Sequence, residues 1–234
     1  MKKMLRVLSL VLCAALALSV SASALASGNA DVKITKRTLK KSTDSYEYKL
    51  SYPRTGITDI DNEIKAFVNR EKKAFLRQVE EYAAGSEVEY ALPKSTLDIN
   101  FKLYRPNRDC FSFLFTVSGY YGGAHPTTFH KAMNFSAGKG EQIDLAEVFV
   151  EGWEEKLAKL CEKPLLREMG VEKHEEDFIG WIREGLLVEN AFHGLVLTKN
   201  GVVIGFDDYQ VGPYATGAPV ISLSKKAIRS LLRD

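Results

Sequence analysis

The sequence predicts an α+β protein, in which an antiparallel β-sheet is packed by one long helix in the N-terminal half. A helical insertion and further strands follow toward the C-terminus. Three observations predict this class: an apolar stripe at helical spacing over residues 59–84, strand-like alternation in three segments between residues 97 and 135, and an Asn-Gly pair at 200–201 between two apolar runs. Helical periodicity, alternation and hairpin turns in one chain are typical of an α+β fold.

The first 26 residues have the pattern of a secretory signal peptide. Three basic residues precede an apolar run that ends at Val20, and the small residues Ala24 and Ala26 follow. We expect cleavage after about Ala26 and a mature protein that is secreted or held at the cell surface. A membrane anchor is the alternative, but the apolar run is short for the roughly 20 residues that a span needs.

The mature chain is nearly neutral in charge. Without residues 1–26 the chain holds 29 Lys and Arg against 30 Asp and Glu. This balance gives no argument for nucleic acid or for an anionic membrane surface. No later apolar run is long enough to span a bilayer. Cys110 and Cys161 remain; export permits a disulfide between them, and two buried thiols are the alternative.

The N-terminal elements follow from turn and capping residues. Strands are expected at about 31–39 and 45–52, with a turn at residues 41–44. The helix over 59–84 is expected to begin at a cap, Asp59 or Asp61, and to end at Gly85. Three alternating strands then form an antiparallel meander. In the third of them, His130 alternates with Phe129, so we expect His130 on the wetter face.

The C-terminal elements are expected to be helices followed by strands. Asp144 can cap a short turn that reaches Phe149, Pro164 should break or restart the next helix, and Ser224 can cap a final helix to Leu232. The remaining elements are helices at about 152–162 and 175–187 and strands at about 192–198, 202–206 and 219–223. A division near residue 140 gives two parts, 27–140 and 141–234, which could share one sheet.

No motif for a metal, a cofactor or a nucleophile stands out. The four histidines lack the i, i+4 spacing of a helical zinc site, and no C-x-x-C or G-x-S-x-G is present. Gly138-Lys139-Gly140 resembles half of a phosphate loop but fits a hairpin turn better. We therefore expect neither a metal nor a cofactor.

One acidic pair could support hydrolysis. Asp207 and Asp208 precede a tyrosine-rich loop, and two carboxylates can act on a glycosidic bond if they flank it. Neighbours on an extended chain point apart, so either would need a distant partner such as Glu189.

Two loops of similar composition are the candidate binding residues. Both combine tyrosines with Gly and Pro, which suits recognition of a protein or a glycan because tyrosine brings a rigid surface and a hydroxyl. The alternative is that the tyrosines pack on their own sheet and the glycines serve the turns. The candidate residues are Tyr120, Tyr121, Gly122, Gly123 and His125 in the first loop, and Tyr209, Gly212, Pro213 and Tyr214 in the second.

These loops and their surroundings carry a resemblance. "YYGGAHPTTFHKAMNF", "IDLAEVF" and "FHGLVLTKNGVVIGFDDYQVGPYATGAPVISLS" resemble a bacterial family of unknown function. That family forms the extracellular part of RsiV-type anti-sigma factors and also lies beside the catalytic domain of PdaC-type peptidoglycan deacetylases. The part before residue 140 resembles its usual companion domain.

The resemblance implies a non-enzymatic role. RsiV-type domains bind lysozyme directly, and in the deacetylases catalysis belongs to a separate domain. We therefore expect a secreted cell-envelope binding module, with lysozyme or another muramidase, or wall glycan, as partner. The alternative is a peptidoglycan or carbohydrate hydrolase that uses Asp207 or Asp208, and a third possibility is a scaffold whose loops are only turns.

Overall fold

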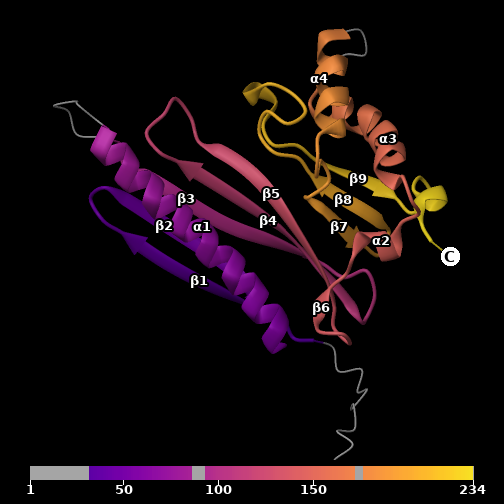
Figure 1. Ribbon diagram of the computed structural model, residues 1–234, viewed down its shortest axis with the longest axis horizontal. Coiled ribbons are helices and arrows are strands. Elements are labelled where there is room, and N and C mark those ends of the chain that lie inside the picture. The colour runs from indigo at the N-terminus through magenta and orange to yellow at the C-terminus, as the bar shows by residue number, and fades with distance from the viewer. Residues whose placement is uncertain (1–31, 86–92, 172–175, 234) are drawn as a thin grey trace, which may run out of the picture.

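The computed structural model describes residues 32–85, 93–171 and 176–233 (Figure 1). The predicted signal peptide lies outside these residues. Among the helices that are described, none is long and apolar enough to cross a membrane. The arrangement is α+β, as the sequence predicts, with one helix on a six-stranded sheet and a second, smaller sheet beside it.

The N-terminal half begins with a hairpin and a crossover. The elements are β1 (Thr35–Ser42), β2 (Tyr46–Arg54), α1 (Thr58–Gly85) and β3 (Ser95–Tyr104). β1 pairs antiparallel with β2, but β3 runs parallel to β2. A parallel pair needs a long connection, and α1 lies within it. The sequence pattern predicts both strands of the hairpin and the helix, but it contains nothing that predicts the parallel pairing.

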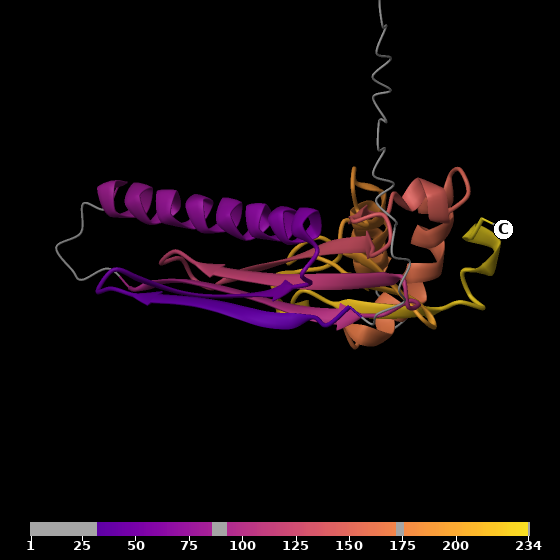
Figure 2. The same cartoon turned by 90° about the horizontal axis from the view of Figure 1, so that it is seen from below.

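The long helix α1 covers one face of the six-stranded sheet (Figure 2). Its apolar stripe is buried against the sheet as predicted, although Tyr82 is only half-buried. The buried stripe residues are Ile60, Ile64, Phe67, Val68, Phe75 and Val79. The Asp61 carboxylate accepts hydrogen bonds from the N–H groups of Thr55 and Gly56, at 2.7 and 3.2 Å. These bonds fix the chain where it enters the helix.

The predicted antiparallel meander is confirmed in β3, β4 (Cys110–Tyr120) and β5 (Thr127–Ser136), and the short β6 (Glu141–Gln142) extends it. On the face toward α1, the aromatic rings of β4 are fully buried, including Phe111, Phe113 and Phe115. Burying a side chain of this size contributes roughly 1.5–3 kcal/mol relative to leaving it exposed. This aromatic row is the centre of the N-terminal core.

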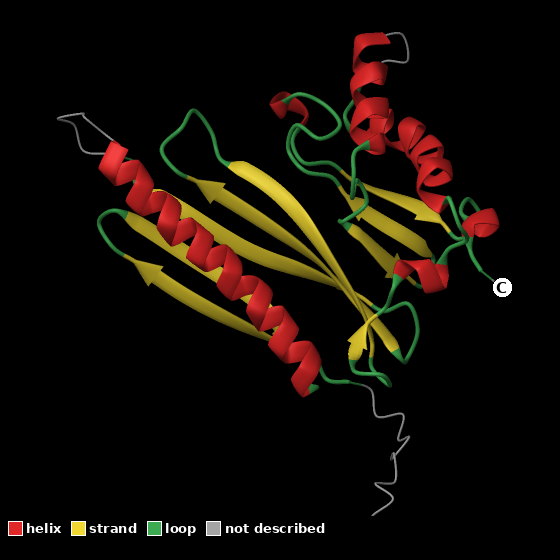
Figure 3. Cartoon of the chain, viewed as in Figure 1, coloured by secondary structure: helices red, strands yellow, loops and turns green. Residues whose placement is uncertain are grey.

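The C-terminal half forms its own sheet (Figure 3). The elements are α2 (Leu145–Val148), α3 (Trp153–Glu168), α4 (Glu176–Leu187), β7 (Leu195–Thr198), β8 (Gly201–Gly205), η1 (Tyr214–Thr216), β9 (Val220–Ser224) and η2 (Arg229–Leu231). β7, β8 and β9 pair only with one another, antiparallel. The two halves therefore do not share one sheet, and the Asn-Gly hairpin predicted at 199–201 is confirmed between β7 and β8.

The second sheet buries both of its faces. Leu195, Val202 and Ile204 point into a core with α3 and α4. Val196 and Val203 point the other way and pack on Leu114 of β4 and Ala132 of β5. The face of β4 and β5 that alternation assigns to solvent is therefore covered by the second sheet.

One predicted helix end is wrong, and the final helix is shorter than predicted. Pro164 lies inside α3, which continues to Glu168 because Leu165 and Leu166 are buried in the C-terminal core. Tertiary burial there outweighs the hydrogen bond that proline cannot donate. Ser224 does accept a hydrogen bond from the Ala227 N–H, at 3.3 Å. Turns follow it, and the predicted short final helix is present only as the 3₁₀ helix η2.

The two cysteines outside the predicted signal peptide are free thiols. Cys161 is fully buried in the C-terminal core, and burial raises the pKa of its thiol to about 12. Cys110, at the start of β4, is half-buried. The alternative of unpaired thiols therefore holds, and no disulfide joins the two halves in the described part of the chain.

Candidate functional site

The acidic pair of the sequence lies along β5, beside the part of this strand that β6 does not pair with. The Asp207 carboxylate accepts the His130 N–H at 2.8 Å, and the Asp208 carboxylate accepts the Thr128 N–H at 2.6 Å. The Asp208 N–H in turn donates to the Thr128 carbonyl at 2.9 Å. Both carboxylates therefore bind the backbone of β5. The carboxylates accept the N–H groups that the carbonyls of a neighbouring strand would otherwise accept, since buried backbone N–H groups need acceptors.

The same edge continues with acceptors from the C-terminal half. The Ala132 N–H donates to the His193 carbonyl at 2.8 Å. The Asn134 side chain donates to the Leu195 carbonyl at 2.9 Å and accepts the Leu197 N–H at 2.8 Å. These bonds hold β5 to the start of β7, so the segments 193–197 and 207–208 join the two halves of the molecule.

His193 completes this junction beside Asp207. Its Nε2 lies 3.1 Å from Asp207 Oδ1, and its Nδ1 lies 2.9 Å from the Asn190 carbonyl. Both ring nitrogens face acceptors, which is the environment of a protonated imidazole. The hydrogen bond to Asp207 is the main reason that the pKa of His193 is raised, and burial opposes it.

His130 is not on a wet face, contrary to the sequence prediction. Its side chain is 3% exposed, and its Nδ1 lies 3.0 Å from the Phe206 carbonyl. Burial lowers the pKa of His130, because the charged ring is disfavoured away from water. The alternation is as predicted, but the second sheet covers the face on which His130 lies.

The two tyrosine-rich loops meet at the surface. The ring of His125, in the β4–β5 loop, stacks on the ring of Tyr214, with centroids 3.6 Å apart and planes at 15°. The Tyr209 hydroxyl lies 2.9 Å from His125 Nε2. His125 Nδ1 lies 3.0 Å from the Pro126 carbonyl. A neutral ring that donates from Nδ1 and accepts the Tyr209 proton at Nε2 satisfies all three groups.

Trp181, from α4, joins this group and was not singled out in the sequence. Its indole Nε1–H donates to the Tyr209 carbonyl at 3.1 Å, and its side chain is 39% exposed. Tyr209 itself is 46% exposed and has a φ of 64°, in the left-handed region. We call His125, Trp181, Tyr209 and Tyr214 the aromatic cluster. The sequence does contain a signal that could have identified Trp181. This residue lies off the apolar stripe of its helix, where a large aromatic side chain is not needed to fill a core.

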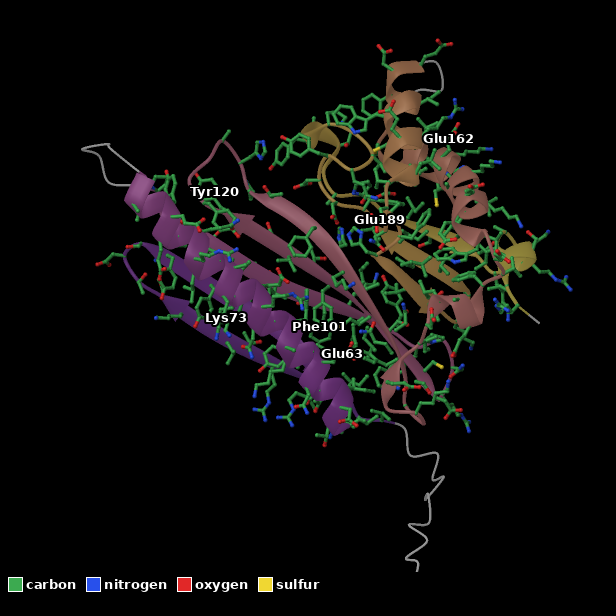
Figure 4. All side chains as sticks on the ribbon, in the orientation of Figure 1. Glu63, Lys73, Phe101, Tyr120, Glu162 and Glu189 are labelled. Atoms are coloured by element: carbon green, nitrogen blue, oxygen red, sulfur yellow. The ribbon has the colours of Figure 1, made fainter. Side chains whose placement is uncertain are left out.

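The other candidate residues of the first loop do not all join the cluster. The Tyr121 ring packs on Phe75 in the N-terminal core at 5.7 Å, and burial raises the pKa of its hydroxyl. Gly122 has a φ of 91° and leaves no room for a side chain beside the Tyr82 ring. Tyr120 is half-buried at the end of β4 (Figure 4), and Gly123 is exposed. Tyr121 and Gly122 therefore fit the alternative of loop packing and turn geometry.

The candidate residues of the second loop also fall into two groups, those that shape the loop and those that belong to the aromatic cluster. Gly212 is buried, and an added Cβ would lie 2.9 Å from the Thr216 hydroxyl and 3.3 Å from the Phe178 ring. Pro213 is half-buried and directly precedes η1, which carries Tyr214. Gly212 and Pro213 shape the loop, and its aromatic part consists of the exposed Tyr209 and the half-buried Tyr214.

The described residues around the acidic pair and the aromatic cluster show no group that could hold a metal. Groups of three or more His, Cys, Asp or Glu side chains that could hold a metal are absent from residues 32–85, 93–171 and 176–233. Asp207 and Asp208 are engaged with the backbone of β5. The arrangement presents aromatic rings with polar edges at the surface.

Comparison with known proteins identifies two family segments in the chain. Residues 39–128 match the family model described as "Deacetylase PdaC", and residues 146–226 match the one described as "Protein of unknown function (DUF3298)". The aromatic cluster draws on both, because His125 lies in the first segment and the other three residues lie in the second.

One curated relative and two solved structures extend this result. The chain is 20% identical over 200 residues to "Peptidoglycan-N-acetylmuramic acid deacetylase PdaC" of Bacillus subtilis, covering 84% of this chain and 41% of the relative. The chain thus spans less than half the length of that relative. A DUF3298 family member from Bacteroides fragilis matches with a TM-score of 0.60 at 15% identity, covering 86% of this chain and 94% of the other. One from Pseudomonas aeruginosa gives 0.60 at 14%, covering 87% and 96%. At these identities the structures show a shared fold.

Proposed function

We propose that this chain, which joins a PdaC-type segment to a DUF3298 segment, is a non-catalytic binding module of the bacterial cell envelope. The predicted signal peptide would export it, with cleavage after about Ala26. The aromatic cluster is the binding surface. One observation carries the proposal: side chains from two loops and a helix converge into a partly exposed aromatic group that neither core requires.

We propose wall glycan as the ligand. A sugar ring has an apolar C–H face and a rim of hydroxyls, and aromatic side chains with polar edges complement both. The cluster offers the exposed rings of Tyr209 and Trp181 beside the stacked His125–Tyr214 pair. The relative that is named as a peptidoglycan deacetylase supports a polymer of this kind as the ligand.

The hydrolase alternative is less well supported. Asp207 and Asp208 would have to leave the N–H groups of His130 and Thr128 in order to reach a substrate. An unpaired buried N–H costs about 1–3 kcal/mol. A structural role for both acids explains their geometry without a reaction.

Lysozyme is the second candidate ligand, and the charge distribution favours it. Residues 143–234 hold 11 Lys and Arg against 16 Asp and Glu, while residues 27–142 hold 18 against 14. The acidic C-terminal half carries Trp181, Tyr209 and Tyr214 and would attract a basic protein. The resemblance to RsiV-type ectodomains points to the same ligand.

Calorimetric titration of residues 27–234, which keep every described residue, tests these proposals. The titrants are N-acetylglucosamine oligomers, soluble peptidoglycan fragments and lysozyme. Tyr209→Ala and Tyr214→Ala should weaken binding of the true ligand by at least about tenfold, the size of one well-packed aromatic anchor. Leu39→Ala, which removes an exposed apolar side chain on β1, is the matched control and should have no effect.

The dependence of binding on ionic strength distinguishes lysozyme from glycan as the ligand. Binding of a basic protein should weaken as ionic strength rises, whereas stacking of a neutral glycan should not. If neither ligand binds, or if both tyrosine variants bind as tightly as the unchanged protein, the proposed function is wrong.

A further inference from the structure

A hollow lies beside β5, and no residue of the aromatic cluster lines it. It has a volume of about 400 Å³ and forms where the segment after α4 meets the start of α3. This volume is within the usual range of about 300–1,000 Å³ for small-molecule sites. Two aromatic rings line it, Trp153 and Phe192, with centroids 5.7 Å apart.

The rim of this hollow is apolar and exposed. Leu187 and Val188 line it, and their side chains are 68% and 52% exposed. Leu186, next to them, is only 3% exposed and belongs to the core. Two adjacent exposed apolar side chains beside an apolar hollow mark a surface that a ligand can cover.

Unpaired charges of both signs border the hollow. Lys131 reaches it from β5, and within the described residues no carboxylate lies within 4 Å of its ammonium group. Glu154 and Glu155 reach it from the first turn of α3. Among the described residues, no cationic side chain lies within 4 Å of either carboxylate. The hollow therefore offers a cation from one element and two anions from another.

His193 lines one side of the hollow, but both of its ring nitrogens already have hydrogen-bond partners. Its ring nitrogens bind Asp207 and the Asn190 carbonyl. Lys131 is close enough to His193 to affect it electrostatically. Lys131 is thus the available cation on that side. Figure 4 shows Glu189, which lies just after α4 in the sequence, between β5 and the C-terminal helices in that view.

We propose that this hollow binds a short peptide that carries both a free carboxylate and a free amine. Lys131 would bind the carboxylate, Glu154 and Glu155 would bind the amine, and the apolar lining would cover the small side chains between them. This inference deepens the proposed function and rests on it, because peptidoglycan is a glycan that bears short peptides with both groups. His193 connects the two sites, since it binds Asp207, two residues before Tyr209 of the aromatic cluster.

The test uses ligands that separate peptide from glycan. Residues 27–234 are titrated with the peptide N-acetyl-L-Ala-γ-D-isoglutaminyl-L-Lys-D-Ala-D-Ala, which has one free amine and one free carboxylate. The same peptide after lysine acetylation or C-terminal amidation and N-acetylglucosamine oligomers that lack peptide are titrated alongside. We expect the free peptide to bind and each modified peptide to bind about tenfold more weakly, the size of one charge-assisted hydrogen bond.

Variants locate the site. Lys131→Met and the double change Glu154→Gln, Glu155→Gln should each weaken peptide binding about tenfold and leave glycan binding unchanged. Tyr209→Ala should do the reverse. Lys199→Met, which removes an exposed lysine in the β7–β8 turn, is the control, and thermal unfolding confirms that each variant is folded.

The outcomes are distinct for the two proposals. Glycan binding without peptide binding would overturn this inference and leave the proposed function standing. Equal binding of free and modified peptides, or full peptide binding by Lys131→Met, would also overturn it. Absence of binding by glycan, peptide and lysozyme would overturn both.

Discussion

The imidazole of His125 lies flat on the ring of Tyr214, with centroids 3.6 Å apart, and so ties the β4–β5 loop to the loop before β9. The Tyr209 hydroxyl holds the same imidazole through Nε2. Since one loop comes from each half of the molecule, these contacts shape the aromatic cluster before any ligand binds. A preformed cluster loses less conformational freedom on binding.

Removal of the stacked ring should loosen the first loop. We expect Tyr214→Ala to lower the free energy of unfolding by at most about 0.5–1.5 kcal/mol, because the pair is partly exposed. Hydrogen exchange should accelerate at the amides of Ala124 and His125 and stay unchanged in the middle of β5. Tyr209→Phe, which removes one hydroxyl and keeps the ring, should have a smaller effect. Unchanged exchange at both amides in Tyr214→Ala would show that the stacking does not order the loop.

Asp207 and Asp208 should behave as structural acceptors. Asp207→Ala leaves the His130 N–H and the His193 ring without their acceptor, so we expect a loss of about 1–3 kcal/mol in urea denaturation. Asp207→Asn keeps a carbonyl oxygen for the N–H and should lose less. If Asp207→Asn instead kept full stability and abolished a measurable release of wall fragments, the hydrolase alternative would be favoured.

His193 should make stability depend on pH. Its folded-state pKa lies above the ordinary value of 6.5, chiefly because of the hydrogen bond to Asp207. Its contribution is therefore complete below that ordinary value and is lost as the pH rises through the raised pKa. His193→Gln should destabilise the protein most near pH 5.5 and progressively less toward about pH 9. Urea midpoints of both proteins across this range measure the difference, and a constant difference would contradict the prediction.

His130 makes stability depend on pH in the opposite direction. Burial lowers its pKa below 6.5, so protonation favours the unfolded chain and stability falls as the pH drops below that value. The charge of His193 is one of the causes that lower the pKa of His130, so this term differs between the two proteins compared above. The His193 effect is therefore read from the difference between the two curves above pH 6.5, where His130 is uncharged in both proteins.

The two thiols should differ in reactivity. Cys161 is fully buried with a pKa of about 12, so little thiolate forms at neutral pH and no reagent reaches it in the folded state. Cys110 is half-buried. In residues 27–234, iodoacetamide at about pH 8 should modify Cys110 first and Cys161 only in denaturant. Mass spectrometry of tryptic peptides distinguishes them, and rapid labelling of Cys161 in the folded protein would contradict the packing around α3.

Local patterns in the sequence predict the elements but not how the two halves meet. The α1 stripe and the β4 alternation are readable because each reflects one buried face. The location of His130 was mispredicted because the residues that cover it, such as Phe206, lie far along the chain. The loops with Tyr120 and Tyr209 were recognisable as candidates from composition. That His125 and Tyr214 would touch depends on the packing of the second sheet on β4 and β5, for which the sequence carries no local signal.

That packing can be tested at Gly205 of β8, which lies against the His130 side chain of β5. An added Cβ at Gly205 would lie 2.6 Å from Cγ of the buried His130 ring. The ring cannot move freely because its Nδ1 is bonded to the Phe206 carbonyl. Gly205→Ala should therefore destabilise the protein by about 1–3 kcal/mol, as overpacking of a core does.

Gly138→Ala is the matched control, because an added Cβ there meets nothing within 4 Å. Its free energy of unfolding should change by no more than about 0.5 kcal/mol, as at other open surface positions. If the sheet interface positions the aromatic cluster, Gly205→Ala should also weaken ligand binding at the cluster, although no residue of the cluster is changed. Normal stability and normal binding in Gly205→Ala would show that His130 and β8 are not packed as described.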